Sequence, residues 1–506
     1  MENRIRILAT SDVHGSITPF RYEDGSEVMQ GLARMKTLVD LLRDDNTLLL
    51  DNGDTIQGSP LQTYHYLKHP EAVSPVTAVM ASMGYDYVNL GNHDFDYGEE
   101  ALMKHLDALK APCITNNVQA KGKPVFASYA VREIGGKKIA LFGVTTHYLK
   151  HLKSNRELRP FRIKEAFESA KNTVQTIQRL EKPDYIIGLY HGGFERDLVT
   201  GMPNRELTGE DQAYRMVREI SGIDVLIAGH THIQACGTAF DTVYAQPGQY
   251  GSCLACIDIY TDTGVIDVRL IPNDTPADSA VLGLVREEEK ECQEWLDTPI
   301  GHTGMDLTIH DQFEARFHKS QVVTLFNKIM LEASGADLAA SALFRDACGF
   351  KPIITMRDLL CTCRHADTLA VKKVTGAQLR QYLEHSAEYW SVDGGRIIVN
   401  PRYLAPKPRP YYYDMADGVE YTINVSNDPG SRIISLTRNG EEVRDDDEFT
   451  LCLCQYRAKG GGNYGFLRDI PNISEIHTDM IELLRREFEK EPVISFEPVD
   501  NIRITK

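Results

Sequence analysis

Gly91-Asn92-His93-Asp94 is the stretch from which the fold and the chemistry of this chain can be worked out. It directly follows an apolar run, Tyr85 to Leu90, that has the length of a buried β-strand. Asparagine oxygens and imidazole nitrogens bind divalent cations, and a neighbouring carboxylate can hold a histidine in one tautomer. Asparagine and aspartate also favour turns and helix starts, so this stretch alone leaves a metal-binding turn and a purely structural turn open.

Similar polar strand ends occur elsewhere along the chain. Further apolar runs predict strands at 4–10, 46–50, 138–144, 184–190 and 224–228. Asp12 and His14 follow the first of these and lie two residues apart, so in an extended segment their side chains point the same way. The strand ends together supply eight groups that can meet a cation: Asp12, His14, Asp54, Asn92, His93, His191, His230 and His232.

Segments with a helical pattern of apolar residues lie between these strands, at 31–43, 74–83, 99–109 and 163–180. Alternating strands and helices predict an α/β fold, in which ligands bind beyond the carboxyl ends of the strands. We therefore expect the eight groups to converge. Nitrogen and oxygen donors without a thiolate suit two divalent cations such as Mn, Zn, Co or Fe. Asp54 has two oxygens, with which it could bridge cations about 3.5–4 Å apart.

Length and charge limit the architectures and partners that fit this chain. A chain of 506 residues is longer than one hydrophobic core usually serves, which predicts two domains. A formal net charge of −17 argues against a nucleic-acid polymer as partner, because phosphate contacts need a basic face. No run approaches the ~20 apolar residues of a membrane span, and residues 1–8 show no secretory signal. We therefore expect a cytoplasmic protein that does not bind a membrane.

Five motifs, taken together, resemble those of a known family. Asp-x-His-Gly, Gly-Asp, Gly-Asn-His-Asp, His-Gly-Gly and Gly-His-Thr-His follow one another as they do in the calcineurin-like metallophosphoesterases. The chain is similar in particular to the 5′-nucleotidases and 2′,3′-cyclic-nucleotide phosphodiesterases of that family. The resemblance implies a four-layer α-β-β-α N-terminal domain, a helical linker and an α+β C-terminal domain of the 5′-nucleotidase type that binds substrate.

The resemblance also implies a role for each residue at the strand ends. One cation would be held by Asp12, His14, Asp54 and His232, and the other by Asp54, Asn92, His191 and His230. His93, supported by Asp94, would be the catalytic residue that binds no metal and stabilises charge on the phosphoryl oxygens or the leaving group.

A capped helix marks the expected boundary between the domains. Ser320 is a suitable N-cap and Gly335 a suitable stop for a helix with apolar residues between them. The resembled family joins its two domains by a helix at this position. We therefore place the catalytic domain at 1–318, the linker helix at 319–335 and the nucleotide-binding domain at 336–506.

Two aromatic stretches in the C-terminal half are candidates for binding a base: Tyr411-Tyr412-Tyr413-Asp414, and Tyr456 shortly before Gly460-Gly461-Gly462. Aromatic rings stack on bases, and glycines let backbone amides approach a ribose or phosphate. The residues alone leave open that the tyrosines are core residues and the glycines a loop. The resemblance implies that Tyr413 and Tyr456 clamp the base, with Arg345 and the three glycines as further substrate contacts.

The expected function is that of a dinuclear metal-dependent phosphoesterase in nucleotide catabolism, acting on small nucleotides as a 2′,3′-cyclic-nucleotide phosphodiesterase or nucleotidase. Residues 340–345 depart from the Asn-Gly-Gly-x-x-Arg loop of 5′-nucleotidases and are closer to the phosphodiesterase branch. Hydrolysis of 5′-nucleotides or UDP-sugars is an alternative, and so is a sensor that binds nucleotides without catalysis. Such a sensor is expected to have lost metal ligands, whereas all eight candidate groups are present.

Overall fold

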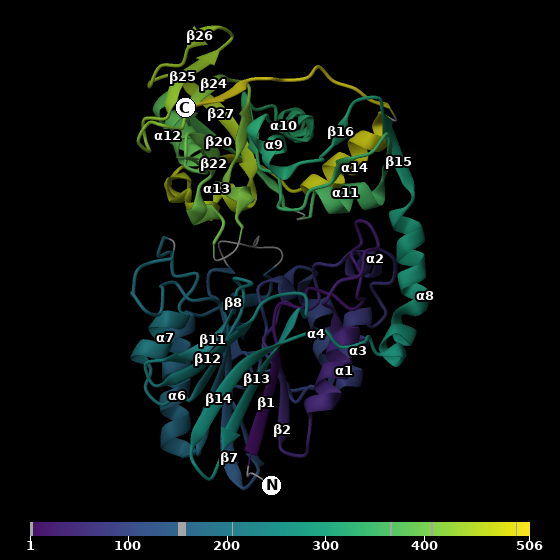
Figure 1. The fold of residues 1–506 in the computed structure, drawn as a ribbon, viewed down its shortest axis with the longest axis vertical. Coiled ribbons are helices and arrows are strands. Elements are labelled where there is room, and N and C mark those ends of the chain that lie inside the picture. Colours follow the sequence, from purple (N-terminus) through teal and green to yellow (C-terminus); the bar gives the residue numbers. More distant parts are fainter. Residues whose placement is uncertain (1–3, 150–157, 205, 365–366, 406–407, 492) are drawn as a thin grey trace. The chain divides into compact units, whose positions relative to one another are not determined.

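The computed structural model describes residues 4–149, 158–204, 206–364, 367–405, 408–491 and 493–506. The chain divides into two compact units, Met1–Cys292 and Gln293–Lys506, each built of sheets and helices (Figure 1). No helix among the described residues has both the length and the apolar character needed to cross a lipid bilayer.

Two sheets pack face to face in the first unit. One sheet has the order β14 (Val265–Pro272), β13 (Cys253–Tyr260), β1 (Arg4–Thr10), β2 (Thr47–Asp51) and β3 (Tyr87–Val88). The other has the order β11 (Gln234–Ala239), β12 (Thr242–Pro247), β10 (Val225–Ala228), β9 (Tyr185–His191), β7 (Lys137–Thr145) and β6 (Ala130–Ile134). Both sheets contribute to the buried core between them, with Ile7 and Leu50 from the first and Leu141 and Ile187 from the second.

Helices cover the outer faces of this pair of sheets. Beside the first sheet lie α1 (Leu32–Leu42), α3 (Pro75–Met83) and α4 (Gly98–Leu109), and beside the second lie α6 (Ala166–Leu180) and α7 (Ala213–Glu219) (Figure 1). On that second side, Phe167 and Val174 of α6 join Phe142 and Val144 of β7 in one apolar cluster. The expected four-layer α-β-β-α arrangement is therefore confirmed.

The strand ends that carry the candidate ligands come from parallel neighbours. β1, β2 and β3 run parallel in the first sheet, and β7, β9 and β10 run parallel in the second. β3 is shorter than the strand predicted at 85–90. Just beyond it, Asn89 Nδ2 donates to Asn52 Oδ1 and to the Val144 carbonyl, each at 3.0 Å. Asn89 therefore ties the loop after β2 to the second sheet, at the edge where the ligands lie.

The helix predicted at 163–180 begins later, at Ala166. Residues Phe161–Ile163 form β8, which pairs antiparallel with β4 (Val118–Ala120). The Glu165 side chain then caps α6 by accepting the Glu168 amide. The apolar pattern alone could not place this boundary, because a strand of 3 residues is too short to show a strand period.

The second unit has the expected α+β composition. Its larger sheet has the order β23 (Met415–Asp417), β17 (Leu338–Ser341), β27 (Glu448–Cys454), β20 (Leu369–Thr375) and β28 (Asn472–Ile476). A second sheet has the order β26 (Glu441–Glu442), β25 (Ile433–Arg438), β24 (Glu420–Asn424) and β30 (Ile502–Thr505). The longer helices are α10 (Gln321–Ser334), α11 (Met356–Thr362), α12 (Gly376–Ala387) and α14 (Met480–Lys490).

α10 has the caps that the sequence predicts. Ser320 accepts the Val322 amide, and Gly335 ends the helix with a left-handed φ of 65°. The helix packs against β17 inside the second unit. Along the chain, the division between the two compact units falls within α8 (Ser279–Leu296). The domain boundaries expected at 318 and 335, and the linking role of 319–335, stay predictions.

Gly53 lies where the loop after β2 touches the loop after β3. Its φ is +88°, and a Cβ there would come within 2.1 Å of the Gly91 nitrogen and 2.4 Å of the Leu90 carbonyl carbon. Both neighbours are backbone atoms, so only a shift of the loop after β3 could relieve the clash. The two loops can therefore approach this closely only because residue 53 has no side chain.

Gly53→Ala is expected to lower the free energy of unfolding by about 2–5 kcal/mol, from a left-handed alanine and the clash with Gly91. Gly122→Ala is the matched control, since Gly122 has a φ of +77° but no atom within 4 Å of its Cβ position. The control should lose only about 1–2 kcal/mol. Urea unfolding of both variants measures the difference, and equal losses would show that the contact between the loops is not tight.

Candidate metal centre

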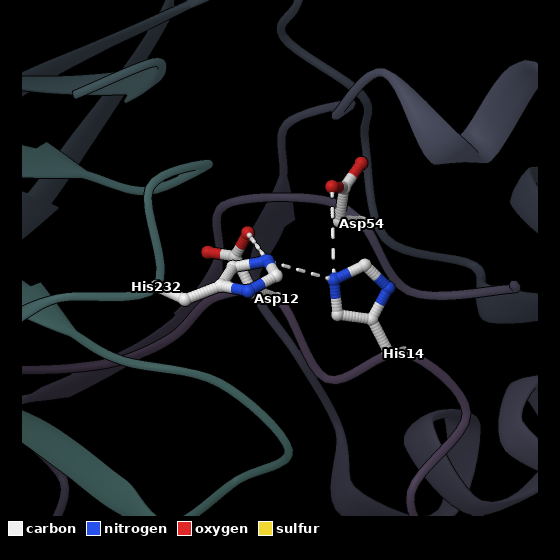
Figure 2. Close-up of side chains that lie close together, drawn as sticks. All are labelled: Asp12, His14, Asp54 and His232. Atoms are coloured by element: carbon white, nitrogen blue, oxygen red, sulfur yellow. Dashed lines mark hydrogen bonds and ion pairs between the residues drawn. The ribbon is translucent and has the colours of Figure 1, made fainter. Parts of the chain in front are cut away.

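The predicted ligands form two overlapping groups of metal-binding atoms in the first unit. One group is Asp12, His14, Asp54 and His232, and the other is Asp54, His191 and His230, with the ligand atoms of each group within 4.8 Å of one another. Figure 2 shows the four side chains of the first group pointing toward one another. Asp54 belongs to both groups, as a bridging ligand must.

Several buried ligand atoms lack a hydrogen-bond partner among the described residues. They are Asp54 Oδ2, Asn92 Oδ1 and His191 Nε2. His191 Nε2 lies 3.2 Å from Asp54 Oδ2, and His14 Nε2 lies 3.1 Å from His232 Nε2. Buried polar atoms in folded proteins are nearly always paired. Divalent cations bound between these oxygen and nitrogen atoms would supply the missing partners.

Backbone carbonyls fix the tautomer of two of the histidines. His14 Nδ1 donates to the Gln57 carbonyl at 3.0 Å, and His191 Nδ1 donates to the Asn52 carbonyl at 2.8 Å. A neutral imidazole has one proton, so each ring keeps its Nε2 lone pair for a cation.

The electrostatics of the centre favour positive charge. Burial acts to lower the pKa of His191, but the Asp54 and Asp12 carboxylates outweigh it and raise that pKa to about 10, so that without a cation Nε2 carries a proton, which a bound cation would replace. Burial acts to raise the pKa of Asp54, yet His191 and His93 hold that pKa well below its usual range. The carboxylates thus stay ionised, which is the state that binds a metal.

The backbone of the ligand loops is strained. Left-handed φ values occur at Asp12 (54°), His14 (50°), Asp54 (57°), His230 (67°) and His232 (58°). Residues other than glycine seldom adopt this conformation, and strained residues cluster at functional sites. Backbone hydrogen bonds hold these loops together, with the Asp12 amide donating to Gly53 and the His14 amide to Asp54, both at 2.8 Å.

His93 is held by Asp96, and the expected support from Asp94 is wrong. His93 Nδ1 lies 2.9 Å from Asp96 Oδ2. Residues His93–Phe95 form a short 3₁₀ turn, in which side chains three positions apart lie on the same face. The sequence carries this signal as an aspartate three residues after the histidine, within His93-Asp94-Phe95-Asp96.

Asp94 instead holds the two ligand loops together. Its buried carboxylate accepts the backbone amides of Gly91, Asp54, Thr55 and Ile56 at 2.8–3.2 Å. One of these amides comes from the loop after β3 and three come from the loop after β2. Asp94 therefore fixes Asp54 relative to Asn92 and His93.

In the second unit, Tyr413 is a core residue and not the base-stacking residue we expected. Its side chain is 1% exposed and stacks on Tyr389, with ring centroids 5.3 Å apart, and it meets Trp390 edge-on. Its ring is therefore enclosed by the core of the second unit. Tyr411 and Tyr456 are half-buried, so these two rings are the accessible aromatics of the two stretches.

A buried arginine joins the two aromatic stretches. Arg457 donates to the Tyr411 carbonyl from the first stretch and to the Gly461 carbonyl from the glycine loop. It also forms two hydrogen bonds to the Asp414 carboxylate, at 2.6 and 3.0 Å. We did not predict this role from the sequence, because hydrogen bonds across forty residues leave no local pattern.

The glycine loop is closely packed against its surroundings. A Cβ on Gly461 would come within 2.4 Å of the Tyr456 ring, and the Gly462 carbonyl lies 3.2 Å from His385 Nε2. Gly460 has a left-handed φ of 92°. Arg345 lies in a different loop and has an exposed side chain. Substrate contacts for Tyr456, Arg345, Gly460, Gly461 and Gly462 stay predictions.

The chain matches the sequence models of two families. Residues 5–234 match the calcineurin-like phosphoesterases, and residues 299–469 match the C-terminal domain of 5′-nucleotidases. Together these matches cover both compact units in part.

Individual relatives agree with these matches. A putative 5′-nucleotidase from Staphylococcus aureus has a solved structure with a TM-score of 0.91 and 30% identity, over 99% of this chain and 100% of that chain. The 2′,3′-cyclic-nucleotide 2′-phosphodiesterase/3′-nucleotidase of Salmonella typhimurium is 26% identical over 90% of this chain and 81% of that protein. The trifunctional nucleotide phosphoesterase protein YfkN of Bacillus subtilis is 25% identical over 92% of this chain, which spans 36% of that protein.

Two neighbouring aspartates are expected to fail in different ways when changed to asparagine. Asp94→Asn should lower the free energy of unfolding by about 1.5–3 kcal/mol, because an amide group would face backbone donors that now meet a carboxylate. Asp96→Asn should change that free energy by about 1 kcal/mol or less but lower kcat about 10- to 100-fold, because His93 loses its orientation. Urea unfolding and steady-state kinetics separate the two. A stability loss confined to Asp96→Asn would reverse these assignments.

Proposed function

This chain belongs to the calcineurin-like phosphoesterases of the 5′-nucleotidase family, and from that premise we propose that it hydrolyses phosphate esters of nucleotides with two divalent cations. The observation that carries the proposal is the pair of ligand groups that share Asp54. The buried atoms of Asp54, Asn92 and His191 that lack hydrogen-bond partners support it, because cations would satisfy them.

The ligands would divide as the geometry groups them. Asp12, His14, Asp54 and His232 would hold one cation, and Asp54, His191 and His230, with Asn92, would hold the other. Bound there, the cations would neutralise charge on the phosphoryl oxygens and lower the pKa of the attacking water, so that it loses its proton near neutral pH and becomes the nucleophile. The His93 amide donates to Asp54 Oδ1 at 2.6 Å, which leaves Oδ2 to face the ligand groups. The donor types fit Mn, Zn, Co or Fe.

His93 would act beside the cations without binding one. Its Nδ1–H would donate a hydrogen bond to Asp96 Oδ2, 2.9 Å away, and Nε2 is the ring nitrogen that would act on the substrate. The His93 ring lies 5.4 Å from the His14 ring, measured between centroids, and its side chain is 24% exposed. From this position a doubly protonated His93 ring, with its Nδ1–H on Asp96, could donate its Nε2 proton to a phosphoryl oxygen or to the leaving group.

We propose nucleotides as the substrates, with 2′,3′-cyclic-nucleotide phosphodiesterase or nucleotidase activity. The Salmonella typhimurium relative carries that name. In the second unit, the half-buried Tyr411 and Tyr456 offer their rings for a base. Arg457 links the two residues, because it donates to the Tyr411 carbonyl and directly follows Tyr456 in the chain.

Hydrolysis of 5′-nucleotides or UDP-sugars is the second candidate, favoured by the likeness to the putative 5′-nucleotidase of Staphylococcus aureus. A non-catalytic nucleotide sensor is disfavoured, because every residue of both ligand groups, together with His93 and Asp96, is in place. The cytoplasmic location expected from the sequence stays a prediction.

Chelator-treated protein is expected to be inactive and to regain activity on binding two equivalents of Mn, Zn, Co or Fe. Among 2′,3′-cyclic AMP, 3′-AMP, 5′-AMP and UDP-glucose, we expect the highest kcat/KM for the cyclic nucleotide. Asp54→Ala removes the shared ligand and should lower kcat at least about 100-fold, whereas Asp107→Asn on the exposed face of α4 should not.

A different best substrate in this panel would move the assignment to the second candidate. A protein that binds two cations and turns over none of the four substrates would support the sensor.

Tyr411→Ala and Tyr456→Ala are each expected to raise KM for nucleotides about 5- to 150-fold, because a stacked base contributes about 1–3 kcal/mol. KM for p-nitrophenyl phosphate, which has no base, should stay unchanged. Tyr413→Phe is the control, since it removes only a buried hydroxyl that has no hydrogen-bond partner among the described residues. Steady-state kinetics on both substrates test this, and equal changes in the two KM values would contradict base stacking.

A further inference from the structure

His230 differs from the buried histidines of the centre, His14 and His191, in what holds its ring. His14 and His191 each donate Nδ1–H to a backbone carbonyl, whereas His230 Nε2 lies 2.8 Å from the Glu210 carboxylate. We propose that Glu210 is a positioning residue that fixes His230 with its proton on Nε2 and so presents Nδ1 to the second cation. The inference rests on the proposed function, and it assigns a role to a residue outside both ligand groups.

The surroundings leave His230 few other ways to hold its ring. Its backbone has a left-handed φ of 67°, and its amide donates to the Asp12 carboxylate at 3.0 Å, so the main chain is fixed. Its ring meets the His191 ring edge-on, with centroids 5.6 Å apart. The contact with Glu210 is shielded from water, because the two side chains are 11% and 16% exposed. The ring orientation is therefore set by this contact and by packing.

Glu210 is itself held in place. Its carbonyl accepts the Thr146 hydroxyl at 2.6 Å and the Tyr190 hydroxyl at 3.2 Å. The next residue, Asp211, accepts the Gly193 amide at 2.7 Å. These bonds attach the loop end before α7 to the ends of β7 and β9. A carboxylate anchored in this way can hold an imidazole at a constant position.

A carboxylate acceptor affects a metal-binding histidine in two ways. It makes the ring a more basic ligand, and it fixes the ring nitrogen that faces the metal. Hydrogen bonds to an ionised acceptor are about twice as strong as those between neutral groups. Loss of such a partner typically lowers metal affinity about 10- to 100-fold. In this chain the loss should fall on the cation bound by His191 and His230, and not on the cation bound by His14 and His232.

Titration calorimetry of the chelator-treated full chain with Mn tests the proposal without using activity. For Glu210→Ala we expect the affinity of one of the two sites to fall about 10- to 100-fold while the other stays within about 2-fold. Glu210→Gln keeps an acceptor oxygen and should lose less. Glu206→Gln makes the same charge change at an exposed position of the same loop and should leave both affinities unchanged.

A double-variant cycle shows whether Glu210 acts through His230. In a His230→Ala background, Glu210→Ala should add less than about a 2-fold loss, because coupled residues do not contribute independently. Circular dichroism and melting in chelator confirm that each variant folds. Unchanged affinities in Glu210→Ala, or an equal loss in the His230→Ala background, would overturn the proposal. A wild-type chain that binds no divalent cation would overturn the proposed function itself.

Discussion

The carboxylate of Asp94 is the constraint on which the centre depends. It accepts amides from the loops after β2 and β3, which come from separate crossovers of the chain. Where these loops touch, Gly53 leaves no room for a side chain. Together the hydrogen bonds and the close contact set the position of Asp54 relative to Asn92 and His93. A bridging ligand is useful only if its two neighbours are fixed, so this backbone clamp is a precondition for the metal chemistry.

Sequence patterns predicted the parts of the fold that follow from local rules. β1 and α10 lie where apolar periodicity and capping residues place them, because burial and caps act within a few residues. The convergence of Asp12, Asp54 and the histidines followed from parallel strands, whose carboxyl ends share an edge. The parts that the sequence did not predict depend on packing: β8 pairs with a distant strand, and Tyr413 lies in a core that only the folded chain defines.

The Arg457–Asp414 pair of the second unit and the ligand groups of the first unit use buried charge differently. In the second unit the Arg457 guanidinium pairs with the Asp414 carboxylate. This buried ion pair has a structural role, since it holds the first aromatic stretch and the glycine loop together. In the first unit the carboxylates of Asp12 and Asp54 face histidine nitrogens and have no arginine or lysine partner among the described residues. A matched pair gives a fixed framework, and an unmatched set attracts a cation. The buried charges of Arg457 and Asp414 are therefore structural, whereas those of Asp12 and Asp54 fit a metal site. This conclusion does not depend on any likeness to other proteins.

The left-handed backbone of the metal ligands has a consequence for how such a protein can change over time. Each of the five residues costs about 1–3 kcal/mol in this conformation, and glycine or asparagine would relieve much of that cost. A lineage that no longer needed the metal chemistry could therefore gain stability by substitution of these five ligands. Substitutions that remove the activity would then raise the free energy of unfolding. This chain still carries all five strained residues.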